Sequence, residues 1–147
     1  MIWLLRHGDA EHVEGKPDSA RELTGKGRRQ SRDAGLALAA LGVELDACLS
    51  SPKIRARDTA ELACEPLGVQ VELDDRLAGG DFDPLELAAG RSDVMLVGHA
   101  PDLPSAIAYV TGSRVKLKKG GLAALDDHVL HLLLRPKELR EIASAAR

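Results

Sequence analysis

Three short segments, far apart in the chain, carry arginine and histidine in settings that suit chemistry on an anion. The first is MIWLLRHGDAEH, where five apolar residues lead directly into Arg6 and His7 before Gly8 interrupts the run. The other two are SSPKIRARDTAE, which contains Arg55, and VGHAPDL, which contains His99. An arginine presents a planar fork of N–H donors to a tetrahedral oxyanion, and a neutral histidine nitrogen can act as a nucleophile.

The elements that must position these residues are strands. Residues 2–6, 47–51 and 93–99 are short apolar runs of the kind that form buried strands. Ligands of open α/β sheets bind beyond the carboxyl ends of the strands, so the arginines and histidines are expected to converge there. Burying unpaired cations together is costly, and a bound phosphate group would offset that cost.

The second segment also predicts a helix over residues 51–68. Ser51 is expected to be its N-cap and Pro52 its first helical residue. The beginning of such a helix would add backbone N–H donors and a partial positive charge to an anion site. Arg57 lies about 200° around the helix from Arg55, so it is not counted among the site residues.

Strands and helices alternate over the first two thirds of the chain, which predicts an α/β fold in one domain over residues 1–147. We expect a three-layer sandwich with a mostly parallel central sheet and helices on both faces. The stretch Gly8–Gly25 is expected to be a functional loop, because long loops inside compact domains usually serve a site. The other predicted elements are helices over residues 26–41, 84–88, 101–110 and 137–147, and strands over residues 69–73, 113–117, 121–125 and 128–134.

The composition is that of a globular protein in a reducing compartment. Of the 147 residues 44% are apolar and 29% are charged, and the formal charge of −3 argues against a nucleic-acid surface. Cys48 and Cys64 lack redox or zinc spacing and are expected to be buried free thiols, which suits the cytoplasm. The apolar N-terminal run, about five residues long, is too short for a signal peptide or a membrane span, so no membrane partner is expected. The sequence leaves the oligomeric state open.

The three segments, in their order, resemble the histidine phosphatase superfamily, also called the phosphoglycerate mutase-like family. The family pattern is an Arg-His-Gly triplet, then Ser-Pro-x-x-Arg-Ala-x-x-Thr, then Gly-His. LLRHGDAE, SSPKIRARDTAE and VGHAPDL follow this pattern, and the resemblance covers roughly residues 1–110. It implies a phosphatase that needs no metal and no cofactor, because side chains supply the positive charge.

The resemblance also implies roles for individual residues. His7 would be the nucleophile that attacks phosphorus and forms a phosphohistidine, which water then hydrolyses. Its attacking nitrogen must be neutral, with the other ring nitrogen hydrogen-bonded, and nearby backbone is the expected partner. Arg6, Arg55 and His99 would bind the equatorial phosphate oxygens, and Gly8 is counted with these substrate-binding residues.

The length of the chain bears on the substrate. Arg55 and His99 are only 44 positions apart, whereas larger members that resemble the mutases insert a longer segment there. A short connection implies a minimal cap and an open pocket, which suits a phosphate displayed on a protein better than an enclosed metabolite. In size and motif spacing the chain resembles the SixA-type phosphohistidine phosphatases.

The three motifs do not include a general acid. Splitting a phosphate ester expels an alkoxide, which a general acid assists, and mutase-like members often supply a glutamate after the third strand. This chain has Gly79 and Gly80 in that region, with Asp81 and Asp83 as candidate acids or as ordinary surface aspartates. A phosphoramidate needs less help, so the sequence favours a protein phosphohistidine substrate. A small-molecule phosphomonoesterase is the alternative, and a non-catalytic phosphate-binding module is a third reading.

Overall fold

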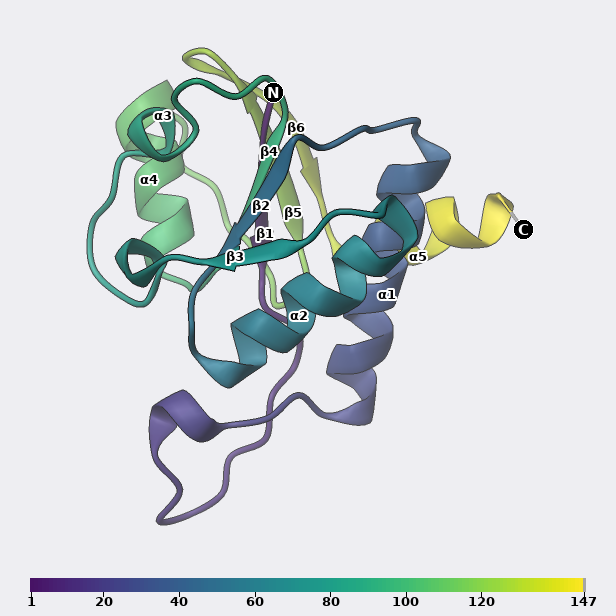
Figure 1. The fold of residues 1–147 in the computed structure, drawn as a ribbon, viewed down its shortest axis with the longest axis vertical. Coiled ribbons are helices and arrows are strands. Elements are labelled where there is room, and N and C mark those ends of the chain that lie inside the picture. The colour runs from purple at the N-terminus through teal and green to yellow at the C-terminus, as the bar shows by residue number, and fades with distance from the viewer. Residues whose placement is uncertain (147) are drawn as a thin grey trace.

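The alternation of strands and helices folds into a three-layer α/β structure (Figure 1). The computed structural model describes residues 1–146. Short 3₁₀ turns at Asp18–Ala20, Glu65–Leu67 and Asp75–Leu77 interrupt the connections. The strands and helices, in chain order, are β1 (Ile2–Arg6), α1 (Gly25–Ala40), β2 (Ala47–Ser50), α2 (Ile54–Cys64), β3 (Val71–Leu73), α3 (Pro84–Leu87), β4 (Val94–Gly98), α4 (Asp102–Thr111), β5 (Leu122–Asp126), β6 (Val129–Leu134) and α5 (Pro136–Ala145).

The six strands form one mixed sheet in the order β3-β2-β4-β1-β5-β6. The first four strands of this order run parallel to one another, and β5 and β6 add an antiparallel hairpin beside β1. The central sheet is therefore mostly parallel, as predicted. The connection between α2 and β4 holds β3, two 3₁₀ turns and the one-turn helix α3, which is the minimal cap expected from its length.

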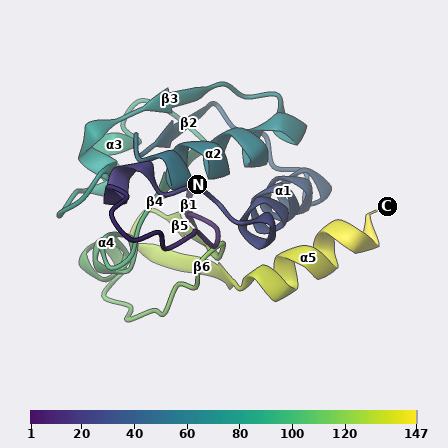
Figure 2. The same cartoon turned by 90° about the horizontal axis from the view of Figure 1, so that it is seen from below.

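Helices cover both faces of the sheet (Figure 2). The central strands β1 and β4 are almost entirely buried, as strands covered on both faces are, and their side chains alternate between two apolar clusters. Trp3 and Leu5 pack with α1, α2 and α5 on one face, whereas Ile2 and Leu4 pack with α3 and α4 on the other. The buried helix residues on the first face are small, mainly alanine, which lets α1 and α2 lie close to the sheet.

One predicted strand and the beginning of one predicted helix are wrong. Residues 113–117 do not form a strand, and they cannot pair with the following strand β5, because β1 and β6 already pair with its two sides. Leu117 instead packs its side chain into the core beside α4. The second helix begins at Ile54 rather than after Ser51, because the backbone N–H of Ser51 still bonds to β4 and its hydroxyl is used in the turn.

The remaining predictions concern termini and thiols. The predicted C-terminal helix is α5, and the last predicted residue, Arg147, lies outside the described residues. Cys48 and Cys64 are both free and buried, as expected. A hydrogen bond with Cys64 and burial raise the pKa of the Cys48 thiol. Within residues 1–146, no helix has the length and apolar character needed to cross a membrane.

Candidate active site

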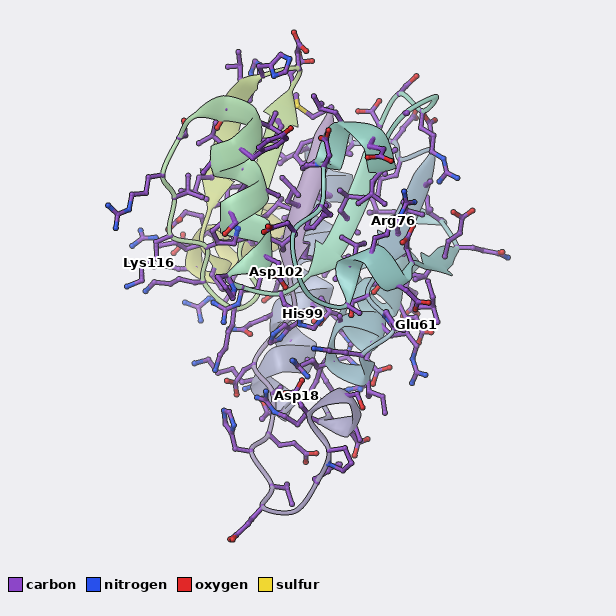
Figure 3. The ribbon with its side chains drawn as sticks, turned by 90° about the vertical axis from the view of Figure 1, so that its left-hand side faces the viewer. Asp18, Glu61, Arg76, His99, Asp102 and Lys116 are labelled. Carbon is purple, nitrogen blue, oxygen red and sulfur yellow. The ribbon has the colours of Figure 1, made fainter. Side chains whose placement is uncertain are left out.

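The three motif segments meet at the carboxyl edge of the parallel strands (Figure 3). In the sheet register Arg6 lies opposite Gly98, and Ser50 lies opposite Val97. Backbone hydrogen bonds extend this pairing beyond the strands. His7 N donates to the Gly98 carbonyl oxygen, and Ser51 N, in the second motif, donates to the Val97 carbonyl oxygen of β4 over 3.0 Å. The convergence expected from strand order is thus produced by backbone hydrogen bonds that leave the side chains free.

His7 is held in one tautomer at this edge. Its Nδ1 lies 2.7 Å from the carbonyl oxygen of Gly8 and must donate to it, because a carbonyl oxygen only accepts. Nε2 therefore carries the lone pair, and the Nε–H of Arg55 donates to it over 3.4 Å. Burial lowers the pKa of His7 to about 4, with the charges of Arg55 and Arg6 acting in the same direction against the Gly8 hydrogen bond. A neutral imidazole with a fixed tautomer is what an attacking nitrogen requires.

His99 stands beside His7, with the ring centroids 5.2 Å apart and the planes tilted by 54°. Its Nε2 lies 2.8 Å from the hydroxyl of Ser51, so the turn that follows β2 orients the ring. Burial lowers the pKa of His99 to about 3, and neighbouring His7 and Arg55 act in the same direction. Its Nδ1 is buried with no hydrogen-bond partner within residues 1–146, which leaves one polar atom for a ligand.

Arg55 is 6% exposed and reaches the site from the first turn of α2. Its Nη1 donates to the Asp18 carbonyl oxygen over 2.8 Å, and its Nη2 lies 3.2 Å from the Asp18 carboxylate. Lys53 contacts the same carboxylate at 3.3 Å. The partial burial of Asp18 acts to raise its pKa, but Arg55, Lys53 and Arg21 together lower it to about 2. Asp18 is thus an ionised carboxylate held on the arginine of the anion site.

Sequence reasoning missed Asp18 and Thr59. Asp18 belongs to the 3₁₀ turn of the long loop after β1, and Figure 3 labels it below His99, beyond the strand ends. A single aspartate in a polar loop carries no spacing signal. Thr59 ends the second motif: its hydroxyl accepts from the Gly8 N–H at 3.1 Å and donates to the Arg55 carbonyl oxygen at 2.7 Å. Thr59 is part of the second motif, but the sequence does not show that its hydroxyl bridges Gly8 and Arg55.

Arg6 is fixed by the segment that follows α4. Its Nη1 donates to the carbonyl oxygen of Leu117 over 2.9 Å, and burial lowers the pKa of its guanidinium. The Nε of Arg6 is buried without a hydrogen-bond partner in the described part of the chain. The backbone N–H of Gly120 lies 3.1 Å from the Arg6 carbonyl oxygen and 2.9 Å from that of His7. This segment therefore braces the end of β1 directly beneath the candidate nucleophile.

Asp81 and Asp83 lie in the segment between the 3₁₀ turn Asp75–Leu77 and α3. The carboxylate of Asp83 accepts from Leu85 N over 2.9 Å and caps α3. Both aspartates line a hollow of about 490 Å³ with Tyr109, and this lining includes none of the four residues at the strand ends. The structure therefore brings His7, Arg55 and His99 together, with Arg6 adjacent, but it does not add either candidate acid to them.

Comparison with known proteins agrees with this geometry. The model of the histidine phosphatase superfamily (branch 1) matches residues 2–108. An uncharacterised protein of Picosynechococcus sp. strain PCC 7002 is 35% identical over 161 aligned positions, which cover 94% of this chain and 98% of the relative. The chain therefore belongs to the histidine phosphatase superfamily and is a hydrolase of that superfamily.

Two solved structures show how far the fold is shared. The protein histidine phosphatase SixA, complexed with tungstate, superposes with a TM-score of 0.81 at 24% identity and covers 94% of this chain and 98% of its own. A phosphoserine phosphatase from Entamoeba histolytica, in complex with 3-phosphoglyceric acid, gives a TM-score of 0.73 at 17% identity, with coverages of 94% and 98%. The same α/β fold thus occurs in proteins named for different substrates.

Proposed function

We propose that the protein is a SixA-type phosphatase that removes phosphate from phosphohistidine on a protein, with His7 as nucleophile and without a metal ion. The observation that carries this proposal is the fixed, neutral state of His7. Its Nδ1–H is bonded to the Gly8 carbonyl oxygen, its Nε2 accepts from Arg55, and the ring of His99 stands beside its own ring. Side-chain cations supply the positive charge that a transferring phosphoryl group requires.

The reaction follows from this arrangement in two steps. Nε2 of His7 attacks phosphorus, the P–N bond of the substrate breaks, and the departing imidazole takes up a proton from solvent. A water molecule then attacks the phosphorus carried by His7, which releases inorganic phosphate and restores the neutral ring. Arg6, Arg55 and His99 bind the equatorial oxygens, where negative charge gathers in the transition state.

The placement of the candidate acids supports a P–N substrate. A histidine leaving group departs more readily than an alkoxide and depends less on a general acid. Asp83 is engaged in capping α3, and Asp81 lines the same separate hollow. A site that includes neither candidate acid among its strand-end residues is better matched to phosphohistidine than to an ester.

The direct test uses a histidine-phosphorylated phosphotransfer domain and a small aryl phosphate as substrates. The proposal predicts that the protein dephosphorylates the domain with a kcat/KM well above that for the ester, and that His7→Ala abolishes both activities. Efficient hydrolysis of small esters together with no action on the phosphohistidine would refute the assignment of the substrate.

A small-molecule phosphomonoesterase is the second candidate, favoured by the shared fold of the phosphoserine phosphatase. In that case Asp81 or Asp83 would serve as general acid after a movement of the segment that carries them. Replacing either by Asn would then slow poor-leaving-group esters far more than aryl phosphates. Equal effects on both classes of ester would rule out this role for the two carboxyl groups.

The same proposal includes a cellular setting. A protein phosphohistidine phosphatase acts on signalling or phosphotransfer proteins, which points to the cytoplasm. The two free, buried thiols are in keeping with a reducing compartment. Fractionation of the producing cell, with the protein detected by an antibody, checks this location.

A further inference from the structure

A strongly basic hollow adjoins the candidate active site and shares Arg6 with it. Its volume is about 760 Å³, and its lining holds nine basic and two acidic side chains. The whole chain carries a formal charge of −3, so positive charge is concentrated here against the overall balance. Figure 3 shows Lys116 at one side of the molecule, with nitrogen-tipped side chains between it and His99.

Apart from Arg6 at the end of β1, the basic side chains come from three segments that are distant in sequence. They stand in the first turns of α1, in the loop between α4 and β5, and in and before the first turns of α5. They are mostly exposed, with long stems that reach into solvent. The six that carry the argument are Lys26, Arg29, Lys116, Lys118, Lys137 and Arg140.

The hollow is joined to the phosphate site through the backbone. Arg6 lines the hollow, and the next residue in the chain is His7. The loop that carries Lys116 and Lys118 accepts a hydrogen bond from the Arg6 side chain, and the N–H of Gly120 bonds to the carbonyl oxygens of both Arg6 and His7. The hollow therefore begins one residue from the candidate nucleophile.

The size and lining of the hollow limit the class of ligand that it can bind. The volume far exceeds that of one phosphate and accommodates several acidic side chains. Its lining contains no aromatic ring on which a base could stack, and its apolar members are Leu117 and Pro136. Cations on exposed, flexible stems from separate segments match the spaced carboxylates of a protein surface, where they favour encounter and orientation.

We infer that this basic hollow docks an acidic segment of the phosphorylated protein, next to the phosphohistidine that is cleaved. The inference rests on the proposed function and adds a rule for choosing among phosphohistidine proteins. Substrates with glutamate or aspartate around the modified histidine are selected over those with neutral surroundings. Electrostatic steering of this kind acts mainly through the rate of association and weakens with salt.

The test compares two synthetic peptides that each contain one phosphohistidine, flanked by glutamates in one and by glutamines in the other. The wild-type protein is expected to prefer the acidic peptide by about tenfold in kcat/KM at low salt, and less at 0.5 M salt. The double variant Lys118→Glu, Lys137→Glu is expected to abolish or invert that preference. The matched control Arg28→Glu, Arg32→Glu reverses two exposed cations of α1 outside the hollow and should keep the preference.

The outcomes separate the two proposals. If the wild type cleaves both peptides with equal kcat/KM, or if both double variants shift the preference equally, the docking inference is overturned and the proposed function stands. If neither peptide is cleaved while an aryl phosphate is, the proposed function fails, and the docking inference fails with it. Loss of the preference in the hollow variant alone supports the inference.

Discussion

At the residue scale, the reactivity of His7 depends on the hydrogen bonds that fix its neighbours. Arg55 contacts both the His7 Nε2 and the Asp18 carboxylate, so one guanidinium joins the candidate nucleophile to an anion of the chain itself. That carboxylate lies 3.2 Å from Nη2 of the arginine, a group that could otherwise donate to a phosphate oxygen. Asp18 therefore positions Arg55 while it opposes the approach of a second anion.

Replacing Asp18 by Asn should separate these two effects. The amide keeps the size of the side chain, and the bond from Arg55 to the Asp18 carbonyl oxygen remains, but the negative charge is removed. Removing a unit charge several ångströms from a phosphate in a partly screened site should tighten binding about fivefold. We expect inorganic phosphate to inhibit D18N at about a fifth of the concentration that inhibits the wild type, measured as a competitive inhibition constant.

Lys16→Gln, two positions before Asp18 in the sequence, provides a control for this prediction. Lys16 is ion-paired with Glu11 and Glu22 in the same loop and has no contact with Arg55. Its removal should leave the inhibition constant of phosphate unchanged. Weaker binding of phosphate to D18N would show that holding Arg55 in place matters more than relief of repulsion.

The sequence predicted the strand-end residues but not the contacts among them. Arg6, His7, Arg55 and His99 were identified because each stands at a fixed place in a motif that follows an apolar run. Asp18 could not be identified in that way, since its role arises only when the long loop folds back onto α2. The local sequence around Asp18 states nothing about that long-range contact.

At the element scale, the path of the chain from β1 through the candidate active site depends on a close approach between α1 and the loop that follows β1. A Cβ atom placed on Gly8 would lie 2.5 Å from the carbonyl oxygen of Gly27, which is far inside contact distance. A Cβ on Gly27 would in turn collide with the carbonyl oxygen of Asp9. Two glycines therefore let two backbones touch, which is the physical reason that a glycine follows the Arg-His pair.

The variant Gly8→Ala should lose about 1–3 kcal/mol of unfolding free energy, as overpacked sites do, together with most of its activity. The overpacked methyl group pushes the loop away from α1 and moves the carbonyl oxygen that holds His7 Nδ1. The matched control is Gly25→Ala, at the first residue of α1, where the nearest atom to an added Cβ is the end of the Arg29 side chain at 3.5 Å. Urea unfolding measures both variants.

The control should be neutral or stabilised by up to about 1 kcal/mol, since alanine favours a helix over glycine. If Gly8→Ala unfolds at the same urea concentration as the wild type and retains its activity, the close approach is not a constraint. Equal destabilisation of both variants would point to a general effect on α1 instead of the contact with Gly8.

Sequence patterns located most elements because apolar periodicity is a local property. These patterns gave the wrong element where hydrogen bonds between segments distant in sequence determine the structure. Residues 113–117 alternate like a strand, yet the neighbouring β5 already has partners on both sides. Ser51 and Pro52 look like the start of a helix, yet Ser51 is still bonded to β4 and to His99, so the helix begins three residues later than its expected N-cap.

At the scale of the whole molecule, burying two neutral histidines makes folding sensitive to acid. The pKa of His7 is lowered to about 4 and that of His99 to about 3, whereas an unfolded histidine titrates near 6.5. Between these values the unfolded chain binds more protons than the folded one. Stability is therefore full above about pH 6.5 and falls as the pH drops toward about 4, where the loss from His7 levels off.

Urea unfolding at pH 7 and pH 5 tests this linkage. The two histidines together should lower the unfolding free energy of the wild type over this interval, by on the order of 2 kcal/mol each. The interval lies above the titration of ordinary carboxyl groups, which keeps their contribution small. In His7→Gln the pH-dependent loss should be about half that of the wild type, whatever its stability at pH 7. Parallel losses in the two proteins would contradict a buried neutral His7.

The central claim is that His7 itself carries the phosphoryl group during turnover. The protein is mixed with a ³²P-labelled aryl phosphate, quenched within milliseconds and mapped by proteolysis under alkaline conditions that preserve phosphohistidine. We expect one acid-labile label, on the peptide that contains His7, and no label in His7→Ala. A label on another side chain, or undiminished turnover by His7→Ala, would contradict the account.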